Sequence, residues 1–278
     1  MALALLFHSL LPSNESYVYG FQNGLSYHAR SHHFLESGFG PPISKSHIAK
    51  RKYKPHLSAT PDNQSTEVDD YLFDVKTTTF LVGGQSLLIG VAALFAAIFK
   101  VPNFGLGPSV EFSMSSIQQG FLMALPLGLL VLFLDSLEDK IPALKDVTKA
   151  TQRSVLALLG GKFKPVIGLV TAIGLGFAAG FGEEMLFRGV LQYKLCSFLP
   201  DVLSVAFSSI IFAALHAVTP LYAFLAWIAS LYFGYLYQIT TNLAVPIFTH
   251  AIYDVAALFY AHWTVSRLSD EEKSKLLI

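Results

Sequence analysis

The sequence predicts an all-α protein: a polytopic bundle of about six transmembrane helices preceded by a disordered N-terminal region. Two features of the composition support this fold class. The 278 residues are 53% hydrophobic and only 14% charged, whereas soluble domains average about 25% charged residues. In addition, residues 202–253 contain no Asp, Glu, Lys or Arg. This stretch is long enough for two spans of about 20 residues and most of a third, so we expect lipid to be the solvent for most of the chain.

The first 60 residues differ in composition from the rest of the chain. They contain nine Ser, six His and six Lys or Arg, but only two acidic residues. A Ser-rich, acid-poor start is typical of an organellar transit peptide. Because Arg30 and Arg51 are the only arginines there, a plastid transit peptide over residues 1–60 fits better than a mitochondrial presequence or an unprocessed tail. A polar linker is expected to follow over residues 61–79.

The predicted membrane bundle covers residues 80–263. Its apolar segments are residues 80–99, 112–134, 166–181 with a continuation through Arg188, 202–218, 221–239 and 243–263. A basic connection, residues 135–164, is expected on the stromal side of the membrane, because loops rich in Lys and Arg stay on the side of synthesis or import. Within it, the short apolar piece 155–159 is expected at the membrane interface. Residues 264–278 are predicted to form a polar C-terminal tail.

Composition also excludes some classes of function. Cys196 is the only cysteine, so neither a disulfide framework nor a cysteine-based metal site can form within the chain. The formal net charge is zero and no basic face is evident, so nucleic acid is not an expected partner. Membrane lipid and a membrane protein or peptide are the expected partners.

Charged residues are rare in the C-terminal half of the chain and therefore informative. Between residues 165 and 262 they are Glu183, Glu184, Arg188, Lys194, Asp201 and Asp254. Lys194 and Asp201 fall in a predicted connection. The other four lie inside or at the ends of predicted spans, where a charge costs about 2.5 to 3.5 kcal/mol on insertion scales and usually has a function.

The third apolar segment ends in a cluster of three charges. Glu184 and Arg188 are four residues apart with the acid first, so they can pair on one helix face. Glu183 points about 100° away and has no cation of its own, which suits a general base. The plainer interpretation of Glu184 and Arg188 is a structural ion pair, whether or not the protein is an enzyme.

Two other segments carry pairs with the same spacing. Phe212 and His216 share a helix face, so the phenyl ring can pack beside the imidazole, and His250 and Asp254 also share a face. Each histidine has an ordinary structural interpretation, His216 as a hydrogen-bonded core residue and His250 as a ring oriented by a carboxylate. A common site is favoured because three apolar segments, otherwise stripped of ionisable groups, each carry one such cluster.

Other polar residues of the last segment receive structural interpretations. His262, next to Trp263, is expected at the membrane interface. Asn242 and Thr249, near His250, are expected to form helix-end or interhelical hydrogen bonds.

Taken in order, these clusters resemble the three motifs of the CPBP intramembrane proteases, the CAAX protease and bacteriocin-processing family. The motifs are Glu183-Glu184-x-x-x-Arg188, Phe212-x-x-x-His216 and His250-x-x-x-Asp254, within residues 166–261. One such motif alone is a weak signal, but three in order on apolar helices are a strong one. The resemblance implies a helical membrane bundle with a conical cavity.

The resemblance also implies roles for the motif residues. Glu183 and His216 would activate a water molecule for attack on a peptide carbonyl, and His250 with the residue at position 254 would stabilise the oxyanion. The remaining motif residues, Glu184, Arg188 and Phe212, would support the site. Direct hydrolysis through Glu183 and His216 is the preferred mechanism, although Glu183, His216, His250 and Asp254 also offer N and O ligands of the kind that Zn²⁺ accepts.

Two departures from the family pattern affect the expected activity. Asp254 stands where the prenyl endopeptidases have Asn, and a carboxylate cannot donate a hydrogen bond to an oxyanion unless it is protonated. It could instead orient His250 or favour a metal. A plastid address would also separate the protein from the prenylated proteins of the cytosolic face, so cleavage of CAAX sequences is not expected.

Three functions remain to be compared. The first is an intramembrane endopeptidase in the thylakoid or inner envelope membrane of the chloroplast. The second is a non-proteolytic scaffold that binds or stabilises other plastid membrane proteins, such as enzymes of pigment metabolism, because a fold does not fix a function. The third is a transporter, because buried acids can carry protons or ions, although no internal repeat or paired broken helices support it.

Overall fold

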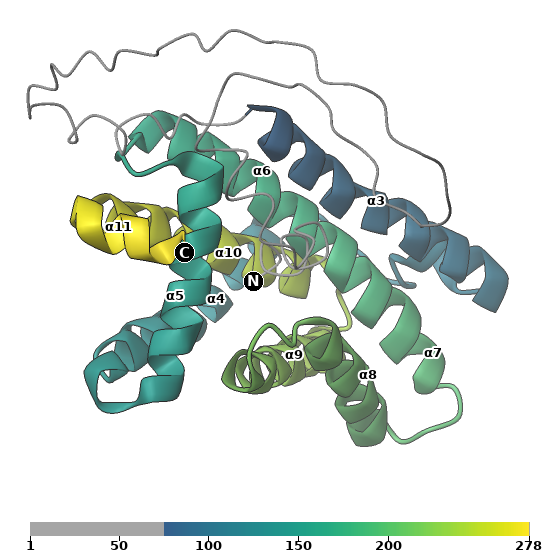
Figure 1. Cartoon of the computed structure of the whole chain (residues 1–278). Coiled ribbons are helices and arrows are strands. Elements are labelled where there is room, and N and C mark those ends of the chain that lie inside the picture. Colours follow the sequence, from purple (N-terminus) through teal and green to yellow (C-terminus); the bar gives the residue numbers. More distant parts are fainter. Residues whose placement is uncertain (1–74, 278) are drawn as a thin grey trace, which may run out of the picture. The chain divides into compact units, whose positions relative to one another are not determined.

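The structure is a computed structural model that describes residues 75–277 (Figure 1). Within this range the chain forms helices and no strands, so the prediction of an all-α bundle is confirmed. The predicted transit peptide, residues 1–60, and residues 61–74 of the predicted linker lie outside the described residues.

Five helical segments are long and apolar enough to cross a membrane. They are α3 (Val75–Phe99), α4 (Met114–Asp135), the continuous segment Pro165–Leu195, α9 (Pro220–Thr240) and α10 (Ala244–Ser266). The remaining apolar segment forms α8 (Asp201–Leu215), which has only 15 residues. At 1.5 Å per residue it is about 22 Å long, less than the roughly 30 Å hydrocarbon core of a bilayer. The multi-pass membrane architecture is therefore confirmed, with five candidate spans and one short apolar helix among the described residues.

The other elements are short or polar. The segment Pro165–Leu195 consists of α6 (Pro165–Glu184), the π-helical turn η4 (Met185–Gln192) and α7 (Tyr193–Leu195). The connections contain η2 (Pro102–Gly105), η3 (Glu138–Lys140) and α5 (Pro142–Leu159), and the chain ends in α11 (Asp270–Leu276).

Several helix ends follow from local sequence. Pro165 and Pro220 occupy the first turns of α6 and α9, where the missing amide hydrogen costs least. The side chains of Ser113 and Thr219 cap α4 and α9 by accepting hydrogen bonds from backbone amides in the first turn, as N-cap residues do. Helix α5 ends at Gly160, whose φ of 77° suits a residue without a Cβ atom.

Small residues allow α10 to lie very close to α6. A Cβ atom added at Gly176 would lie 2.9 Å from the carbonyl oxygen of Ala251, and one at Gly180 would lie 2.8 Å from the Ala251 amide nitrogen. Small residues at such contacts let helix backbones approach in membranes. This approach matters because Glu183 follows one turn after Gly180 on α6, while His250 precedes Ala251 on α10.

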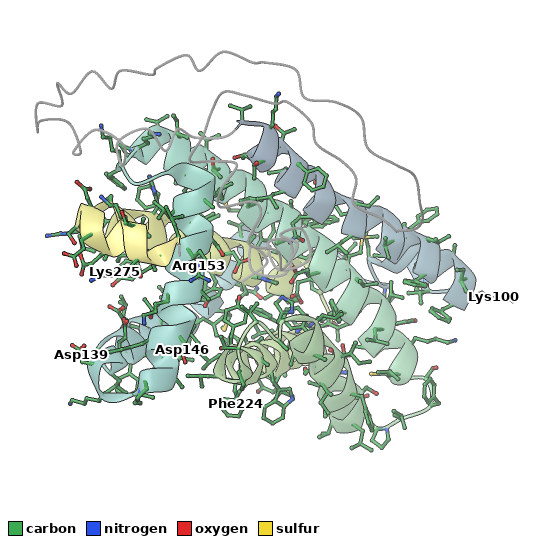
Figure 2. The ribbon with its side chains drawn as sticks, viewed as in Figure 1. Lys100, Asp139, Asp146, Arg153, Phe224 and Lys275 are labelled. Carbon is green, nitrogen blue, oxygen red and sulfur yellow. The ribbon has the colours of Figure 1, made fainter. Side chains whose placement is uncertain are left out.

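The outer surface of the spans is apolar, while the connecting elements and α11 carry charged residues. Leu87 on α3, Val166 on α6 and Phe224 on α9 are 53–73% exposed, as expected for side chains in contact with lipid. In contrast, Asp139, Asp146, Arg153 and Lys275 belong to η3, α5 and α11, as Figure 2 shows.

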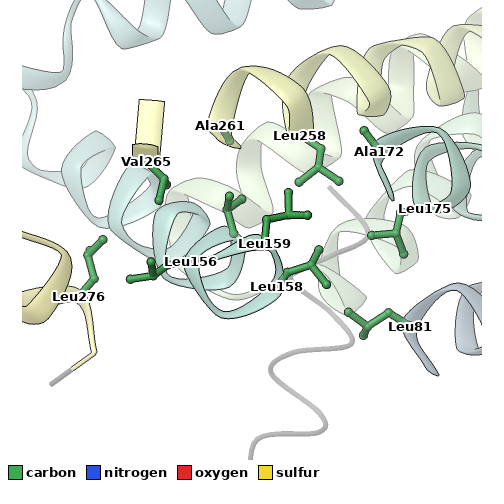
Figure 3. Close-up of a cluster of buried hydrophobic side chains, with 11 residues drawn as sticks. Leu81, Leu156, Leu158, Leu159, Ala172, Leu175, Leu258, Ala261, Val265 and Leu276 are labelled. Carbon is green, nitrogen blue, oxygen red and sulfur yellow. The ribbon is translucent and has the colours of Figure 1, made fainter. Parts of the chain in front are cut away.

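The apolar end of α5 is buried against α10 and α11. Leu156, Leu158 and Leu159 are fully buried and pack with Val265 and Leu276 (Figure 3). Residues 155–159 were expected at the membrane interface, and four of their five side chains, those of Val155, Leu156, Leu158 and Leu159, form part of the core. The reason is that α5 is amphipathic and turns this apolar end inward.

The C-terminal tail is helical and attached to α5. The Ser269 side chain caps α11 in a reciprocal arrangement with Glu272, and the Nε of Arg153 donates a hydrogen bond of 2.6 Å to the carbonyl oxygen of Leu276. Leu276 is 7% exposed and belongs to the cluster of Figure 3. The segment predicted as a polar tail thus contributes two buried apolar side chains, those of Val265 and Leu276, to the core.

Candidate active site

The three sequence motifs meet in the interior of the bundle. Glu183 lies at the end of α6, His216 at the C-terminal end of α8, and His250 and Asp254 one turn apart on α10. All four side chains are buried, and Asp254 is the most exposed of them at 5%. Ionisable residues that are more than 30 positions apart in the sequence therefore share one buried cluster.

Glu183 faces both imidazole rings. Its Oε2 atom lies 3.6 Å from Nε2 of His216 and 3.9 Å from Nε2 of His250. These distances exceed the roughly 2.7–3.2 Å of a direct hydrogen bond. The carboxylate and the two rings therefore face one another without direct hydrogen bonds between them.

The other ring nitrogens are held by strong acceptors. Nδ1 of His216 donates to the carbonyl oxygen of Phe212 over 2.7 Å, and Nδ1 of His250 donates to Oε1 of Glu184 over 2.8 Å. A carbonyl oxygen only accepts, so Nδ1 of His216 carries a hydrogen and Nε2 of the neutral ring is a base. The same assignment follows for His250 from its carboxylate partner, and both Nε2 atoms face Glu183.

The facing atoms have no hydrogen-bond partner in the described part of the chain. They are both carboxylate oxygens of Glu183 and the Nε2 atoms of His216 and His250. Buried polar atoms are nearly always hydrogen-bonded, and each exception requires an explanation. Three of these atoms, Oε2 of Glu183 and the two Nε2 atoms, face one another, so a polar reactant placed among them would be bound from several sides.

Glu184 joins the first motif to the third. Its Oε1 atom accepts from Nη1 of Arg188 at 3.1 Å as well as from Nδ1 of His250. The ion pair suggested by the spacing of Glu184 and Arg188 is present, and the same oxygen also orients His250. A second partner for Glu184 could not be inferred from spacing, because His250 lies 66 residues away.

Arg188 is completely enclosed by partners from α8 and α9. Its Nη2 atom donates to the carbonyl oxygen of Ser230 at 2.7 Å and to the Ser230 hydroxyl at 2.8 Å. Its guanidinium also lies 5.1 Å from the ring centroid of Phe212 and 5.5 Å from that of Phe233, within the range of a cation–π interaction. These contacts therefore hold the Arg188 guanidinium in one position next to the site.

Each site histidine stacks on a phenylalanine. Phe212 lies 4.1 Å from His216 with the ring planes 15° apart, and Phe233 lies 4.7 Å from His250 with the planes 14° apart. Sequence reasoning identified Phe212 but missed Phe233 and Ser230. Both missed residues belong to α9, which contains no Asp, Glu, Lys, Arg or His, so the pattern of charged residues carried no signal for them.

The residues after Glu184 continue as the π-helical turn η4. Such turns are rare and often occur at functional sites. The turn is held from outside by the hydroxyl of Ser208, which donates to the carbonyl oxygen of Phe187 at 3.0 Å, and by Gln192, whose amide donates to the carbonyl oxygen of Gly234 at 3.1 Å. These bonds fix the section of helix that carries Arg188.

The geometry gives the zinc alternative no support. Over residues 75–277, no three His, Cys, Asp or Glu side chains are grouped so that they could hold a metal ion. Nδ1 of His250 is bonded to Glu184, and its Nε2 lies 3.5 Å from Oδ2 of Asp254. The set of Glu183, His216, His250 and Asp254 therefore fits a hydrogen-bonding cluster better than the ligand sphere of a metal.

Three other polar residues have structural positions. Nε2 of His262 accepts a hydrogen bond from the Lys164 amide at 3.0 Å, and its side chain is fully buried. His262 was expected at the membrane interface, and in the structure its ring is buried within the protein and caps the start of α6. Asn242 links the start of α10 to the backbone of Glu111, and Thr249 donates to the carbonyl oxygen of Val245 within its own helix.

The comparison with protein families covers the same part of the chain. Residues 165–256 match the family described as Type II CAAX prenyl endopeptidase Rce1-like. The resemblance to the CPBP family is confirmed over this segment. The match covers about a third of the chain and includes all three motifs. No curated protein and no solved structure matches the chain.

Proposed function

We propose that the protein is an intramembrane endopeptidase of the CAAX-protease type, in which Glu183 and His216 activate water for attack on a peptide bond. The observation that carries this proposal is the group of four buried atoms without hydrogen-bond partners, which belong to Glu183, His216 and His250. The family match over residues 165–256 supports the same reaction class.

The reaction follows from the orientation of these groups. A water molecule bound between Glu183 and Nε2 of His216 loses a proton to the Glu183 carboxylate as its oxygen bonds to the carbonyl carbon. The carbonyl oxygen becomes an oxyanion. When the C–N bond breaks, the proton passes from Glu183 to the leaving nitrogen, which releases an amine and a carboxylic acid.

His250 is the proposed donor to the oxyanion. Three carboxylates, those of Glu183, Glu184 and Asp254, share this buried cluster with one guanidinium. Charge balance therefore favours an additional proton on an imidazole. With Nδ1 committed to Glu184, a protonated His250 presents its Nε2–H bond to the reacting carbonyl, as an oxyanion hole requires.

This arrangement gives Asp254 a role that suits a carboxylate. Its Oδ2 atom lies 3.5 Å from Nε2 of His250, close enough to stabilise the protonated ring electrostatically. In the proposal Asp254 orients and charges His250, and the acid takes no direct part in donating to the oxyanion. The difference from the Asn of the prenyl endopeptidases is thereby compatible with hydrolysis.

The proposed setting is a chloroplast membrane, with a membrane protein or peptide as substrate. The multi-pass architecture and the apolar outer surface support contact with lipid, and the composition of residues 1–60 supports a plastid address. Import of a fusion of residues 1–60 to a fluorescent protein would test this location. Retention of the fusion in the cytosol would contradict it.

The proposed activity is tested with purified protein in liposomes that contain peptides with one transmembrane segment. Wild type is compared with Glu183→Ala, His216→Ala and a control, Glu271→Gln, which alters an exposed acid on α11. We expect cleavage by wild type and by the control only. Equal cleavage rates for all four proteins would contradict the proposal.

A further inference from the structure

Helix α9 contributes no charged residue to the site, yet it contacts one of the site histidines. The helix lies beside α8 and α10 (Figure 1), and the ring of its Phe233 stacks on the imidazole of His250. Phe233 belongs to none of the three sequence motifs. The stacked ring therefore contacts the proposed oxyanion donor without having a role in the proposed reaction.

Hydrogen bonds alone do not fix the plane of the His250 ring. Its Nδ1 atom is bonded to Oε1 of Glu184 over 2.8 Å, whereas its Nε2 atom has no hydrogen-bond partner in the described part of the chain. A single hydrogen bond holds one edge of a planar ring and leaves the tilt of the ring about that bond open. The direction of Nε2, which lies 3.9 Å from Oε2 of Glu183, therefore depends on a second constraint.

Phe233 supplies a flat surface against which this ring lies. The two ring centroids are 4.7 Å apart and the ring planes differ by 14°. The phenyl ring is fully buried and packs with Leu127 and Ala229, so it is itself held in place. A tilt of the imidazole would either press its atoms against the phenyl face or separate them from it, and both changes lose contact energy. The stacking therefore restricts the rotation that the hydrogen bond to Glu184 leaves open.

The backbone of α9 is also attached on both sides of Phe233. The carbonyl oxygen of Ser230 accepts a hydrogen bond from Nη2 of Arg188 at 2.7 Å. The carbonyl oxygen of Gly234 accepts one from the side-chain amide of Gln192 at 3.1 Å. Both bonds are buried and join α9 to the helical segment that carries the first motif. They therefore keep the Phe233 ring at a constant distance from the site.

The other site histidine receives the same two kinds of contact from its own helix. Nδ1 of His216 donates to the carbonyl oxygen of Phe212, and the two rings stack with centroids 4.1 Å apart. For His250 the two contacts come from different helices, because Glu184 on α6 accepts the hydrogen bond and Phe233 on α9 supplies the stacked ring. Phe233 is therefore the structural counterpart of the motif residue Phe212.

We propose that Phe233 is a positioning residue for the reaction, whose ring holds the His250 imidazole with Nε2 directed at the carbonyl oxygen of the scissile bond. The inference rests on the proposed endopeptidase function and adds a residue to the same site. In this role Phe233 acts through His250 and has no contact with the substrate. Removing its ring should therefore weaken the stabilisation of the transition state and leave substrate binding unchanged.

Peptide cleavage by variants of α9 tests this role. Phe233→Leu removes the flat ring, Phe233→Tyr keeps it, and Phe224→Leu is the matched control because Phe224 is exposed on the same helix. We expect kcat of Phe233→Leu to fall by about 10-fold or more with KM unchanged, and kcat of Phe233→Tyr and Phe224→Leu to stay close to the wild-type value. Phe233→Met, which also lacks the ring, replaces Phe233→Leu if that protein does not fold. Equal kcat values for Phe233→Leu and Phe224→Leu, or equal losses in Phe233→Leu and Phe233→Tyr, would overturn the inference.

Nitrogen NMR separates this inference from the proposed reaction, because it requires no hydrolysis. Isotope-labelled histidine is incorporated into wild type, Phe233→Leu and Phe224→Leu in liposomes, and the His250 ring signals are assigned by their loss in His250→Gln. We expect one set of His250 signals in wild type and Phe224→Leu, and additional or broadened signals in Phe233→Leu, whose imidazole is no longer held in one orientation. Unchanged His250 signals in Phe233→Leu would overturn the inference even where peptides are cleaved. The expected signals in a protein that cleaves no peptide would support the positioning of His250 and contradict the proposed reaction alone.

Discussion

Glu183 and Glu184 are adjacent in sequence and almost equally buried, at 1% and 0% exposed, yet their surroundings are opposite. One oxygen of Glu184 is bonded to Arg188 and His250. Both oxygens of Glu183 lack a hydrogen-bond partner in the described chain. A buried carboxylate without partners destabilises a fold, so the comparison supports the proposed division, in which Glu184 serves the structure and Glu183 serves the reaction.

The difference comes from helix geometry. Consecutive residues on an α-helix point about 100° apart, so two neighbouring acids face different elements. Glu184 contacts Arg188 one turn ahead and Nδ1 of His250 on α10, whereas Glu183 faces His216 at the end of α8 and the other ring nitrogen of His250. In the proposed reaction, this pair of adjacent glutamates therefore supplies both a structural contact and a reactive group.

The largest expected effect is on turnover in Glu183→Gln. The substitution keeps the shape of the side chain but removes the base, so the cleavage rate should fall by about 10²- to 10⁴-fold. The melting temperature should stay the same or rise, because a buried negative charge without hydrogen-bond partners is removed. Peptide cleavage and thermal unfolding in detergent measure the two effects, and a large loss of stability would contradict the division of roles.

The second expected effect is on the stability of Glu184→Gln. This substitution leaves the guanidinium of Arg188 buried without its countercharge, which costs about 3–5 kcal/mol in comparable buried pairs. Thermal unfolding of Glu184→Gln beside Glu271→Gln measures the loss. An unchanged melting temperature for Glu184→Gln would show that the ion pair is not what holds α6 in place.

A smaller effect is expected for Ser230→Ala. The variant removes the hydroxyl that accepts from Nη2 of Arg188 but keeps the carbonyl acceptor of the same residue. Hydrogen bonds to charged groups contribute about 1.5–3 kcal/mol, so stability should fall by less than in Glu184→Gln. A double-mutant cycle with Glu184→Gln and Ser230→Ala should show that their effects on stability are coupled. Strictly additive effects would show that Ser230 does not stabilise the Glu184–Arg188 ion pair.

The smallest effect concerns pH and α11, far from the site in sequence. Hydrogen bonds from the hydroxyl and amide of Ser269 hold the pKa of Glu272 below its usual range. A carboxyl whose folded pKa is depressed stabilises the fold above its unfolded pKa and loses this contribution as pH falls through the folded value. The protection factors of the α11 amides, which compare their hydrogen exchange with that of an unfolded chain at the same pH, should therefore fall below about pH 4, and Glu272→Gln should remove this pH dependence.

Much of the fold could be predicted from the sequence because each membrane span must satisfy its own backbone. Hydropathy alone located α3, α4, α9 and α10 to within a few residues. It could not show that α8 is too short to span, since apolar residues continue past its end at His216. Hydropathy also could not show that Leu156 and its neighbours are buried in the protein, because apolar side chains are favoured both in lipid and in a protein core.

The sequence identified the part of the candidate site that consists of ionisable residues. The four ionisable residues Glu183, His216, His250 and Asp254 stood out because they lie in apolar segments. Ser230 and Phe233 are uncharged and therefore did not stand out. The hydrogen bond between Glu184 and His250 depends on the close contact of α6 with α10, which the sequence does not show. Sequence therefore indicated the reacting groups, while the groups that orient them required the structure.

The scaffold alternative predicts the opposite outcome in the cell. A protein that only binds other membrane proteins would need the fold and would not need the proton-accepting groups of Glu183 and His216. Both side chains lie at the cluster without hydrogen-bonding each other, so their joint removal is expected to spare the fold.

The most direct test of the central claim is complementation of a mutant that lacks this protein by the double variant Glu183→Ala, His216→Ala. Growth and the abundance of the introduced protein would be measured together with those of the wild-type rescue. The proposed chemistry predicts that the double variant accumulates normally and fails to rescue. Full rescue at equal abundance would contradict a catalytic role for the cluster.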